Sequence, residues 1–195
     1  MKKIMMFIDS NNFYKNAENL VGKKPKFCWA NLILGIRDLY QQVEADSNFI
    51  KAYYYSALAD RADNPIKYDA QKRFLDAIVR LSFVEVILGY LMRKPTDESV
   101  PIDKNNPATY YHVEKGTDVN LSNDILMNAF QQKVDVALLV AADGDFGDTL
   151  TKAHTCGIEF FLVLPLGSPA SKLKSLIKPE NIIHLDERFL RTFLL

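Results

Sequence analysis

Two apolar runs, each ending in acidic residues, constrain the fold of this chain most strongly. The run from Lys3 to Ile8 is followed by Asp9. The run from Val134 to Ala141 is followed by Asp143 and Asp145. Continuous apolar runs of this length are typical of strands buried on both faces of a parallel sheet. Because open parallel sheets bind ligands at the carboxyl ends of their strands, both runs are predicted to bring carboxylates to a metal site that acts on phosphate.

Length and composition limit the class of protein. The chain has 195 residues, of which 48% are hydrophobic, and we expect one globular domain spanning residues 1–195. The formal net charge is zero, which argues against a protein that coats nucleic acid through bulk charge but permits an enzyme with a local basic rim. The two cysteines, Cys28 and Cys156, lack metal-ligand spacing and are expected to be reduced thiols of a cytoplasmic protein. No apolar run approaches the roughly 20 residues of a membrane span, so no membrane partner is expected.

Strands and helices are predicted to alternate along the chain, which is the pattern of an α/β fold. The predicted strands are residues 3–8, 49–57, 84–92, 134–141 and 158–164, with a possible last strand at 181–185. The predicted helices are residues 12–20, 29–43, 65–81, 118–130, 146–156, 169–177 and 187–193. Residues 93–108 contain three prolines and are predicted to form a surface loop, followed by a short strand at 109–114.

The connections between these strands predict their order in the sheet. Right-handed crossovers in a doubly wound sheet give the order 3-2-1-4-5, in which the first and fourth strands are neighbours. Adjacent strands lie about 4.8 Å apart. This spacing would bring Asp9 and Asp143 close enough to share a divalent cation.

Ordinary structural roles offer an alternative explanation for these acidic residues. Asp9 could cap the helix that follows it, but each of the next three residues could cap it equally well, which favours a functional role for Asp9. The segment 143–145 could be only a turn before a helix, since Asp and Gly both favour turns. Its position directly after a buried strand favours a functional role here too.

Asp118 stands where another helix is predicted to begin. Thr117 is its predicted N-cap, and Gly116 permits an unusual backbone angle. Asp118 would then lie in the first turn, where interaction with the helix dipole alone could explain it. Because this helix leads into the fourth strand, its N-terminus should face Asp143 at the carboxyl edge of the sheet. Asp124 lies about 120° away around the same helix and is expected to point outward or to support the site indirectly.

Other polar and aromatic residues are assigned weaker roles. Asp60 and Asp63 follow the second strand and are interpreted first as loop residues. The three histidines lack the spacing of metal ligands and are interpreted as ordinary. Tyr54 or Tyr110 could stack a nucleic-acid base. The lysines that could guide a nucleic-acid backbone are Lys23, Lys24, Lys26 and Lys115.

Three segments, taken together in this order, carry a family resemblance. They are the strand end Phe7-Ile8-Asp9-Ser10-Asn11-Asn12, the helix start Lys115-Gly116-Thr117-Asp118-Val119 with Asp124 downstream, and the turn Ala141-Ala142-Asp143-Gly144-Asp145-Phe146. In these segments the chain resembles the NYN domain family, a branch of the PIN-like nucleases, over roughly residues 3–164. It departs from the family pattern twice. Ser10 stands where the family often has Gly, and Ala141-Ala142 replace the common Ser-Gly, so that a hydroxyl near the acidic turn is missing.

The resemblance implies a PIN-like Rossmannoid fold, which is a three-layer sandwich around a mostly parallel sheet. It also implies a metal-dependent nuclease that hydrolyses phosphodiester bonds, in RNA more than in DNA, with Mg²⁺ or Mn²⁺ as the cofactor. The residues implied as both catalytic and metal-binding are Asp9, Asp118, Asp143 and Asp145. The residues implied as substrate-binding are Asn11, Asn12 and Lys115. Carboxylate and water ligands favour these two metals over Zn²⁺.

Two other functions are considered beside the nuclease. One is a catalytically inactive module with the NYN fold that binds RNA or a protein partner. The other is a small-molecule phosphohydrolase. Phosphatases with an Asp-x-Asp motif after the first strand use the first Asp as nucleophile, and the presence of Asn11 two residues after Asp9 counts against that class. A homodimer is the default expectation for a small α/β protein.

Overall fold

The fold is built on a six-stranded parallel sheet. The computed structural model describes residues 1–195, and the strands lie in the order β3-β2-β1-β6-β7-β8 with every neighbouring pair parallel. These strands are β1 (Lys2–Asp9), β2 (Ser47–Ser56), β3 (Val84–Leu88), β6 (Val136–Val140), β7 (Glu159–Pro165) and β8 (Ile182–Leu185). The predicted fold class is confirmed. The strand order differs in detail, because β8 adds a sixth strand beyond β7 and two further strands lie outside the sheet.

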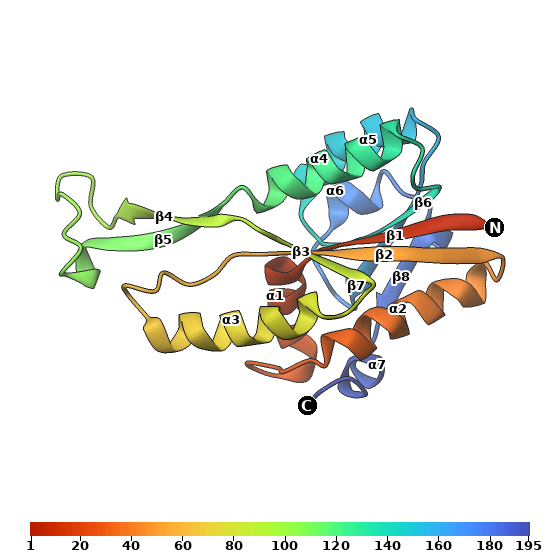
Figure 1. The fold of residues 1–195 in the computed structure, drawn as a ribbon. Helices are drawn as coiled ribbons and strands as arrows, with labels where there is room; N and C mark the ends of the chain where they lie inside the picture. The colour runs from red at the N-terminus through yellow and green to blue at the C-terminus, as the bar shows by residue number, and fades with distance from the viewer.

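Helices cover both faces of the sheet and make the fold three-layered (Figure 1). They are α1 (Ser10–Val21), α2 (Trp29–Val43), α3 (Pro65–Val79), α4 (Thr117–Phe130), α5 (Gly147–His154), α6 (Ser171–Lys174) and α7 (Glu187–Arg191). Residues of α1, α2, α3 and α7 share one core with the sheet, and residues of α4, α5 and α6 share the core on the other face.

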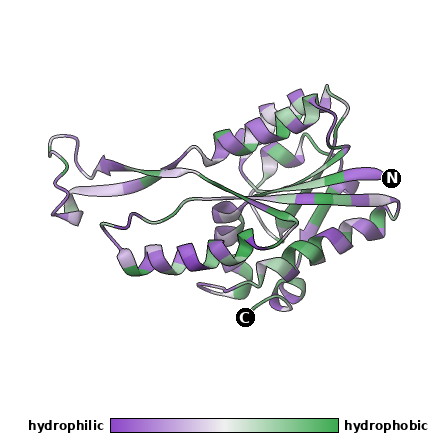
Figure 2. Cartoon of the chain, viewed as in Figure 1, coloured by the Kyte–Doolittle hydropathy of each residue, from purple (hydrophilic) through white to green (hydrophobic).

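The central strand β1 contributes to both cores. Ile4, Met6 and Ile8 belong to the core beneath α1 and α2, whereas Met5 and Phe7 belong to the core beneath α4. Successive side chains of a strand point to opposite faces, so a strand covered on both faces must be apolar throughout. Figure 2 shows hydrophobic colouring along the central strands and hydrophilic colouring on the outward faces of the helices.

The predicted third strand is too long, because the chain leaves the sheet after β3. The following residues form β4 (Tyr90–Pro95), which pairs antiparallel with β5 (Tyr110–Lys115) in a two-stranded ribbon. The prediction of a loop from residue 93 was therefore wrong for residues 93–95. The ribbon projects from the body beyond the carboxyl ends of the sheet strands, and residues 96–109 form its tip (Figure 1).

Gly89 marks the point where β3 ends and the ribbon begins. A Cβ atom at this position would lie 2.5 Å from the Lys115 carbonyl oxygen and 2.5 Å from Thr117 Oγ1. The backbone here therefore packs directly on the segment that starts α4. Along β4, half-buried and exposed side chains alternate, which is typical of a strand with one solvated face and unlike the continuous apolar runs of the sheet.

Four of the predicted helices are longer than those observed. The helix expected at 65–81 ends at Val79, and the one expected at 146–156 is preceded by a short 3₁₀ turn at 144–146. The helix expected at 169–177 is reduced to α6, and the one expected at 187–193 ends at Arg191.

Replacement of Gly89 by alanine tests the close approach between β3 and the start of α4. We expect Gly89→Ala to lower the free energy of unfolding by about 3 kcal/mol, more than its control does, since the new Cβ would clash with the Lys115 carbonyl oxygen, a backbone atom that cannot move without shifting its segment. The measurement is urea denaturation. Gly157→Ala is the control: Gly157 has φ 88° and open space around it, so this change reports backbone strain alone, about 1–2 kcal/mol. Equal or smaller destabilisation by Gly89→Ala would contradict the close packing.

Candidate active site

Asp9 stands at the junction of β1 and α1. It is the last residue of β1 and the N-cap of α1, and its Oδ1 accepts a hydrogen bond of 3.0 Å from the Asn12 backbone N–H. The neighbouring Ser10 hydroxyl donates to the Tyr55 carbonyl at 2.7 Å, which joins the ends of β1 and β2. Asp9 therefore caps α1, which is the ordinary structural role that was considered as the alternative to a functional one. It is also only 6% exposed, which a helix cap alone does not need.

Asn12 joins the two central strands at their carboxyl ends. Its Oδ1 accepts a hydrogen bond of 2.8 Å from the backbone N–H of Ala142, which lies just after β6. The side chain of Asn16 donates to the same oxygen at 3.1 Å. Asn12 therefore holds the acidic turn after β6 against the start of α1, and this is a positioning role.

The start of α4 brings a second acidic segment to the same edge. Gly116, with φ 86°, is the N-cap, and Thr117 is the first residue of the helix, so the prediction of Thr117 as the cap was wrong by one position. The Thr117 hydroxyl instead donates to Glu114. Asp118 lies in the first turn, as expected, and is exposed.

The turn after β6 supplies the third acidic segment. Asp143 caps the short 3₁₀ turn, and its Oδ1 accepts a hydrogen bond of 2.9 Å from the Asp145 backbone N–H. Asp143 and Asp145 therefore both belong to a turn, as the turn preference of Asp and Gly suggested. Asp143 is half-buried, whereas Asp145 is exposed.

A cavity of about 320 Å³ lies among these three segments. Its polar lining consists of Asp9, Asn11, Asn12, Lys15, Glu114, Lys115, Thr117, Asp118 and Asp143. We call it the acidic cavity, since four carboxylates face two lysines. The structure thus brings together six of the seven residues that the sequence singled out. The exception, Asp145, does not line the cavity.

Glu114 was missed at the sequence level. It is the next-to-last residue of β5, and it accepts hydrogen bonds from the Asn11 side chain and from the Thr117 hydroxyl. These bonds fix two walls of the acidic cavity to each other. The signal was present, because Glu114 is a carboxylate at a strand end directly before the Lys115-Gly116 pair. The strand it ends belongs to the two-stranded ribbon and not to the parallel sheet.

Burial and neighbouring carboxylates raise the pKa of two carboxyl groups of the acidic cavity, Asp9 and Asp118. Burial and the nearby charges of Asp118, Glu114 and Asp143 together raise the pKa of Asp9 to about 6, against the hydrogen bond from Asn12 that lowers it. Burial is also the largest cause of the raised pKa of Asp118, followed by the charges of Asp143 and Glu114. A bound cation would relieve this repulsion. Carboxylate oxygens are the donors that Mg²⁺ and Mn²⁺ prefer, so this donor set fits either metal.

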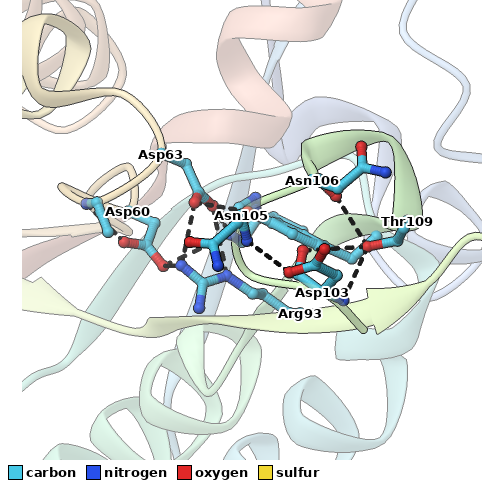
Figure 3. Close-up of polar contacts among 10 residues, drawn as sticks. Asp60, Asp63, Arg93, Asp103, Asn105, Asn106 and Thr109 are labelled. Carbon is cyan, nitrogen blue, oxygen red and sulfur yellow. Dashed lines mark hydrogen bonds and ion pairs between the residues drawn. The ribbon is translucent and has the colours of Figure 1, made fainter. Parts of the chain in front are cut away.

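A second acidic group lies along the middle and outer part of the ribbon, where Arg93 pairs with His112 and Pro95 with Tyr110 (Figure 3). The ligand atoms of Asp60, Asp63 and His112 all lie within 4.8 Å of one another, close enough to bind a metal ion. A cation from the chain already lies among them, because Arg93 Nη2 is 2.6 Å from Asp60 Oδ2 and 3.1 Å from Asp63 Oδ1. No three carboxylates of the acidic cavity meet this 4.8 Å spacing.

This Arg93 cluster anchors the ribbon to the loop between β2 and α3. The Tyr110 hydroxyl donates to Asp63 Oδ1 at 2.6 Å, and the Arg93 guanidinium lies 5.0 Å from the Tyr110 ring centre. The Tyr110 hydrogen bond, together with Arg93, holds the pKa of Asp63 below its usual range. Asp60 and Asp63 are thus loop residues, as interpreted, but His112 is not ordinary: its Nε2 lies 3.0 Å from Asp63 Oδ2.

Three other residues that the sequence singled out are held in structural roles away from the acidic cavity. Asp124 accepts a hydrogen bond of 2.9 Å from the Tyr55 hydroxyl and does not line the acidic cavity, in agreement with an indirect role. Tyr54 and Tyr110, which were predicted as possible stacking surfaces, are 4% and 5% exposed. Neither ring has a free face for a base.

The parallel three-layer sandwich and the acidic edge define a PIN-like α/β protein. The sequence model of the NYN domain matches residues 3–184, so this chain belongs to the NYN domain family, which is generally nuclease-like. A crystal structure of a protein of unknown function from Vibrio parahaemolyticus is similar, with a TM-score of 0.60 and 19% sequence identity over 100% of this chain and 96% of that chain. At this identity the likeness shows the fold alone. No curated protein matches the chain.

No helix of the protein is both long enough and apolar enough to span a bilayer.

The buried charge of Asp9 predicts a pH-dependent stability. A folded-state pKa of about 6, above the ordinary 3.8, means that the folded protein holds a proton more tightly than the unfolded chain. Stability of the metal-free protein should therefore fall as pH rises from about 4 through about 6, by about 3 kcal/mol at most. Asp9→Asn keeps a capping oxygen and should raise the free energy of unfolding at pH 8, with little effect at pH 4.

The measurement is denaturation in EDTA at both pH values. Asp186→Asn is the matched control, because Asp186 also caps a helix but is exposed. An equal response of the two variants to pH would contradict the electrostatic account of Asp9.

The Arg93 cluster predicts how the ribbon is held. Arg93→Met should speed amide hydrogen exchange along β4 and β5, because two carboxylates lose their cationic partner. Lys94→Met, on the next residue of the same strand, should leave exchange unchanged, since Lys94 makes no ion pair and is exposed. Because the pKa of Asp63 is lowered, the anchoring should also weaken as pH falls below the ordinary Asp range. Equal exchange in both variants would show that the ribbon is held by its other contacts.

Proposed function

We propose that this protein is a metal-dependent nuclease that hydrolyses phosphodiester bonds, in RNA more than in DNA. The observation that carries the proposal is the convergence of four carboxylates from three separate segments on one cavity around the buried Asp9. Membership of a nuclease-like family supports the same reaction class. A purely structural role for this group is disfavoured, because like charges brought together without a cation raise one another's pKa and destabilise the fold.

The residues that would hold Mg²⁺ or Mn²⁺ are Asp9, Asp118 and Asp143, with Glu114 beside them and Asp145 at the margin. Such an ion, when bound, lowers the pKa of a water molecule and stabilises the leaving oxygen of a phosphodiester. Asp9 is held in one orientation by its hydrogen bond from Asn12 and by burial, so its carboxylate is preorganised.

Other residues of the acidic cavity would bind and orient the substrate. Lys15 and Lys115 are exposed at its margin and would attract the phosphate backbone. The first-turn N–H groups of α4 add a partial positive charge on the same side. Asn11 is oriented by its hydrogen bond to Glu114, which leaves its amide oxygen available to a ligand. Asn12 keeps the ends of β1 and β6 together and supports the site without contacting substrate.

One observation favours the alternative of a non-cleaving module that binds RNA or a protein. No three carboxylates of the acidic cavity meet the 4.8 Å spacing that the Arg93 cluster meets. The Ala141-Ala142 pair also provides no hydroxyl beside the acidic turn. Metal affinity distinguishes the two functions, because a binding module does not require one.

Cleavage of labelled single-stranded RNA, single-stranded DNA and duplex DNA tests the proposal. We expect cleavage with Mn²⁺ or Mg²⁺, no cleavage with EDTA, and a loss of at least about a hundredfold in Asp143→Asn. Asp148→Asn is the control, since Asp148 is exposed on α5 and does not line the acidic cavity. Mn²⁺ should also raise the melting temperature of the wild type more than that of Asp143→Asn. A folded protein that neither cuts nor gains stability from metal would favour the binding module.

A further inference from the structure

A second cavity adjoins the acidic cavity on the other side of α1. It has a volume of about 570 Å³ and lies between α1, α3 and the segment 24–29. We call it the α1–α3 groove; the residues that carry its chemistry are Tyr14, Lys24, Lys26, Trp29, Lys67 and Phe74. Asn11 lines both cavities, so they meet at this residue.

The floor of the α1–α3 groove is a chain of aromatic rings. The Trp29 and Tyr54 rings meet edge to face with centres 4.9 Å apart, and the Tyr54 and Phe74 rings follow at 6.3 Å. Trp29 and Tyr54 are buried, whereas Phe74 is 38% exposed. Packed rings of this kind form a rigid platform, and an exposed ring on such a platform can stack a base of any type.

The rim of the groove is basic. Lys24, Lys26 and Lys67 are exposed, and none of them forms an ion pair. No Asp or Glu side chain lines the groove. The acidic cavity beside it has the opposite character. This separation of charge suits a ligand that carries negative phosphates and an apolar ring, and it disfavours an uncharged hydrophobic partner.

Polar groups within the groove could read the edge of a base. Gln71 Oε1 accepts a hydrogen bond of 2.7 Å from the Ala59 backbone N–H, which orients the amide and leaves its Nε2 donors free. The Ser56 hydroxyl also lines the groove and makes no hydrogen bond within the chain. An aromatic floor, a basic rim and oriented polar groups are the parts of a nucleotide-binding site.

We propose that the α1–α3 groove binds the nucleotide next to the scissile phosphate of a single-stranded nucleic acid. The base stacks on Phe74 beside Tyr14, and the backbone phosphates lie against Lys24, Lys26 and Lys67. The inference rests on the proposed function, since it makes the acidic cavity the place of the reacting phosphate. A duplex would bind less well, because its bases are already stacked and paired.

The test is the affinity of short fluorescein-labelled RNA and DNA oligonucleotides, single-stranded and duplex, measured by anisotropy in EDTA. Phe74→Ala should weaken single-strand binding by about tenfold. Phe130→Ala is the matched control, because Phe130 is 79% exposed at the far end of α4. The slope of log affinity against log salt should fall by about 0.7 for each of Lys24→Gln and Lys67→Gln, and not for the control Lys72→Gln, since Lys72 lies on α3 but does not line the groove. The RNA and DNA arms identify the sugar that the groove prefers.

Equal affinity of Phe74→Ala and Phe130→Ala, an unchanged salt slope in the lysine variants, or duplex binding as tight as single-strand binding would each overturn the assignment. Melting curves of every variant check that the fold is intact. Because binding is measured without metal, it is independent of cleavage. Groove-dependent binding without cleavage would contradict the proposed nuclease alone, and cleavage that ignores the groove variants would contradict the groove alone.

Discussion

The buried carboxylate of Asp9 is the constraint on which the arrangement of this protein depends. A charged side chain that is almost fully buried needs hydrogen bonds, a favourable dipole or a cation. The end of β1 and the start of α1 supply the first two, through the Asn12 N–H and the helix N-terminus. Repulsion from the surrounding carboxylates then favours a cation at this point. The same junction holds β1, β2 and β6 together through Ser10 and Asn12.

The zero net charge of the chain conceals two local fields of opposite sign. Four carboxylates gather in the acidic cavity, and three lysines without ion pairs lie along the α1–α3 groove beside it. A sum over the sequence cancels them, although their effects on a ligand differ. For a nucleic acid the two fields complement each other, because one favours a cation and the other favours phosphate.

The ribbon of β4 and β5 connects the site to a distant part of the chain. Its end at Glu114 and Lys115 forms one wall of the acidic cavity, and Gly89 packs against the same segment. Farther along the ribbon, Arg93 attaches it to the loop after β2 through Asp63. The position of Glu114, and with it that of Asn11, therefore depends on how firmly the ribbon is held.

The sequence by itself determined the parallel sheet, the main pairs of neighbouring strands and the acidic residues at the carboxyl edge. The reason is that continuous apolar runs of this length are typical of strands buried on both faces. The sequence did not reveal that the chain leaves the sheet at Gly89, where the backbone packs on Lys115 and Thr117, which are distant in sequence. Only the tertiary structure decided that Glu114 enters the acidic cavity and that Asp145 does not line it. It alone also paired Asp63 with Arg93 and buried Tyr54 beneath Phe74. Such roles depend on which segments pack together, and the local sequence pattern does not specify the distances between segments in the folded protein.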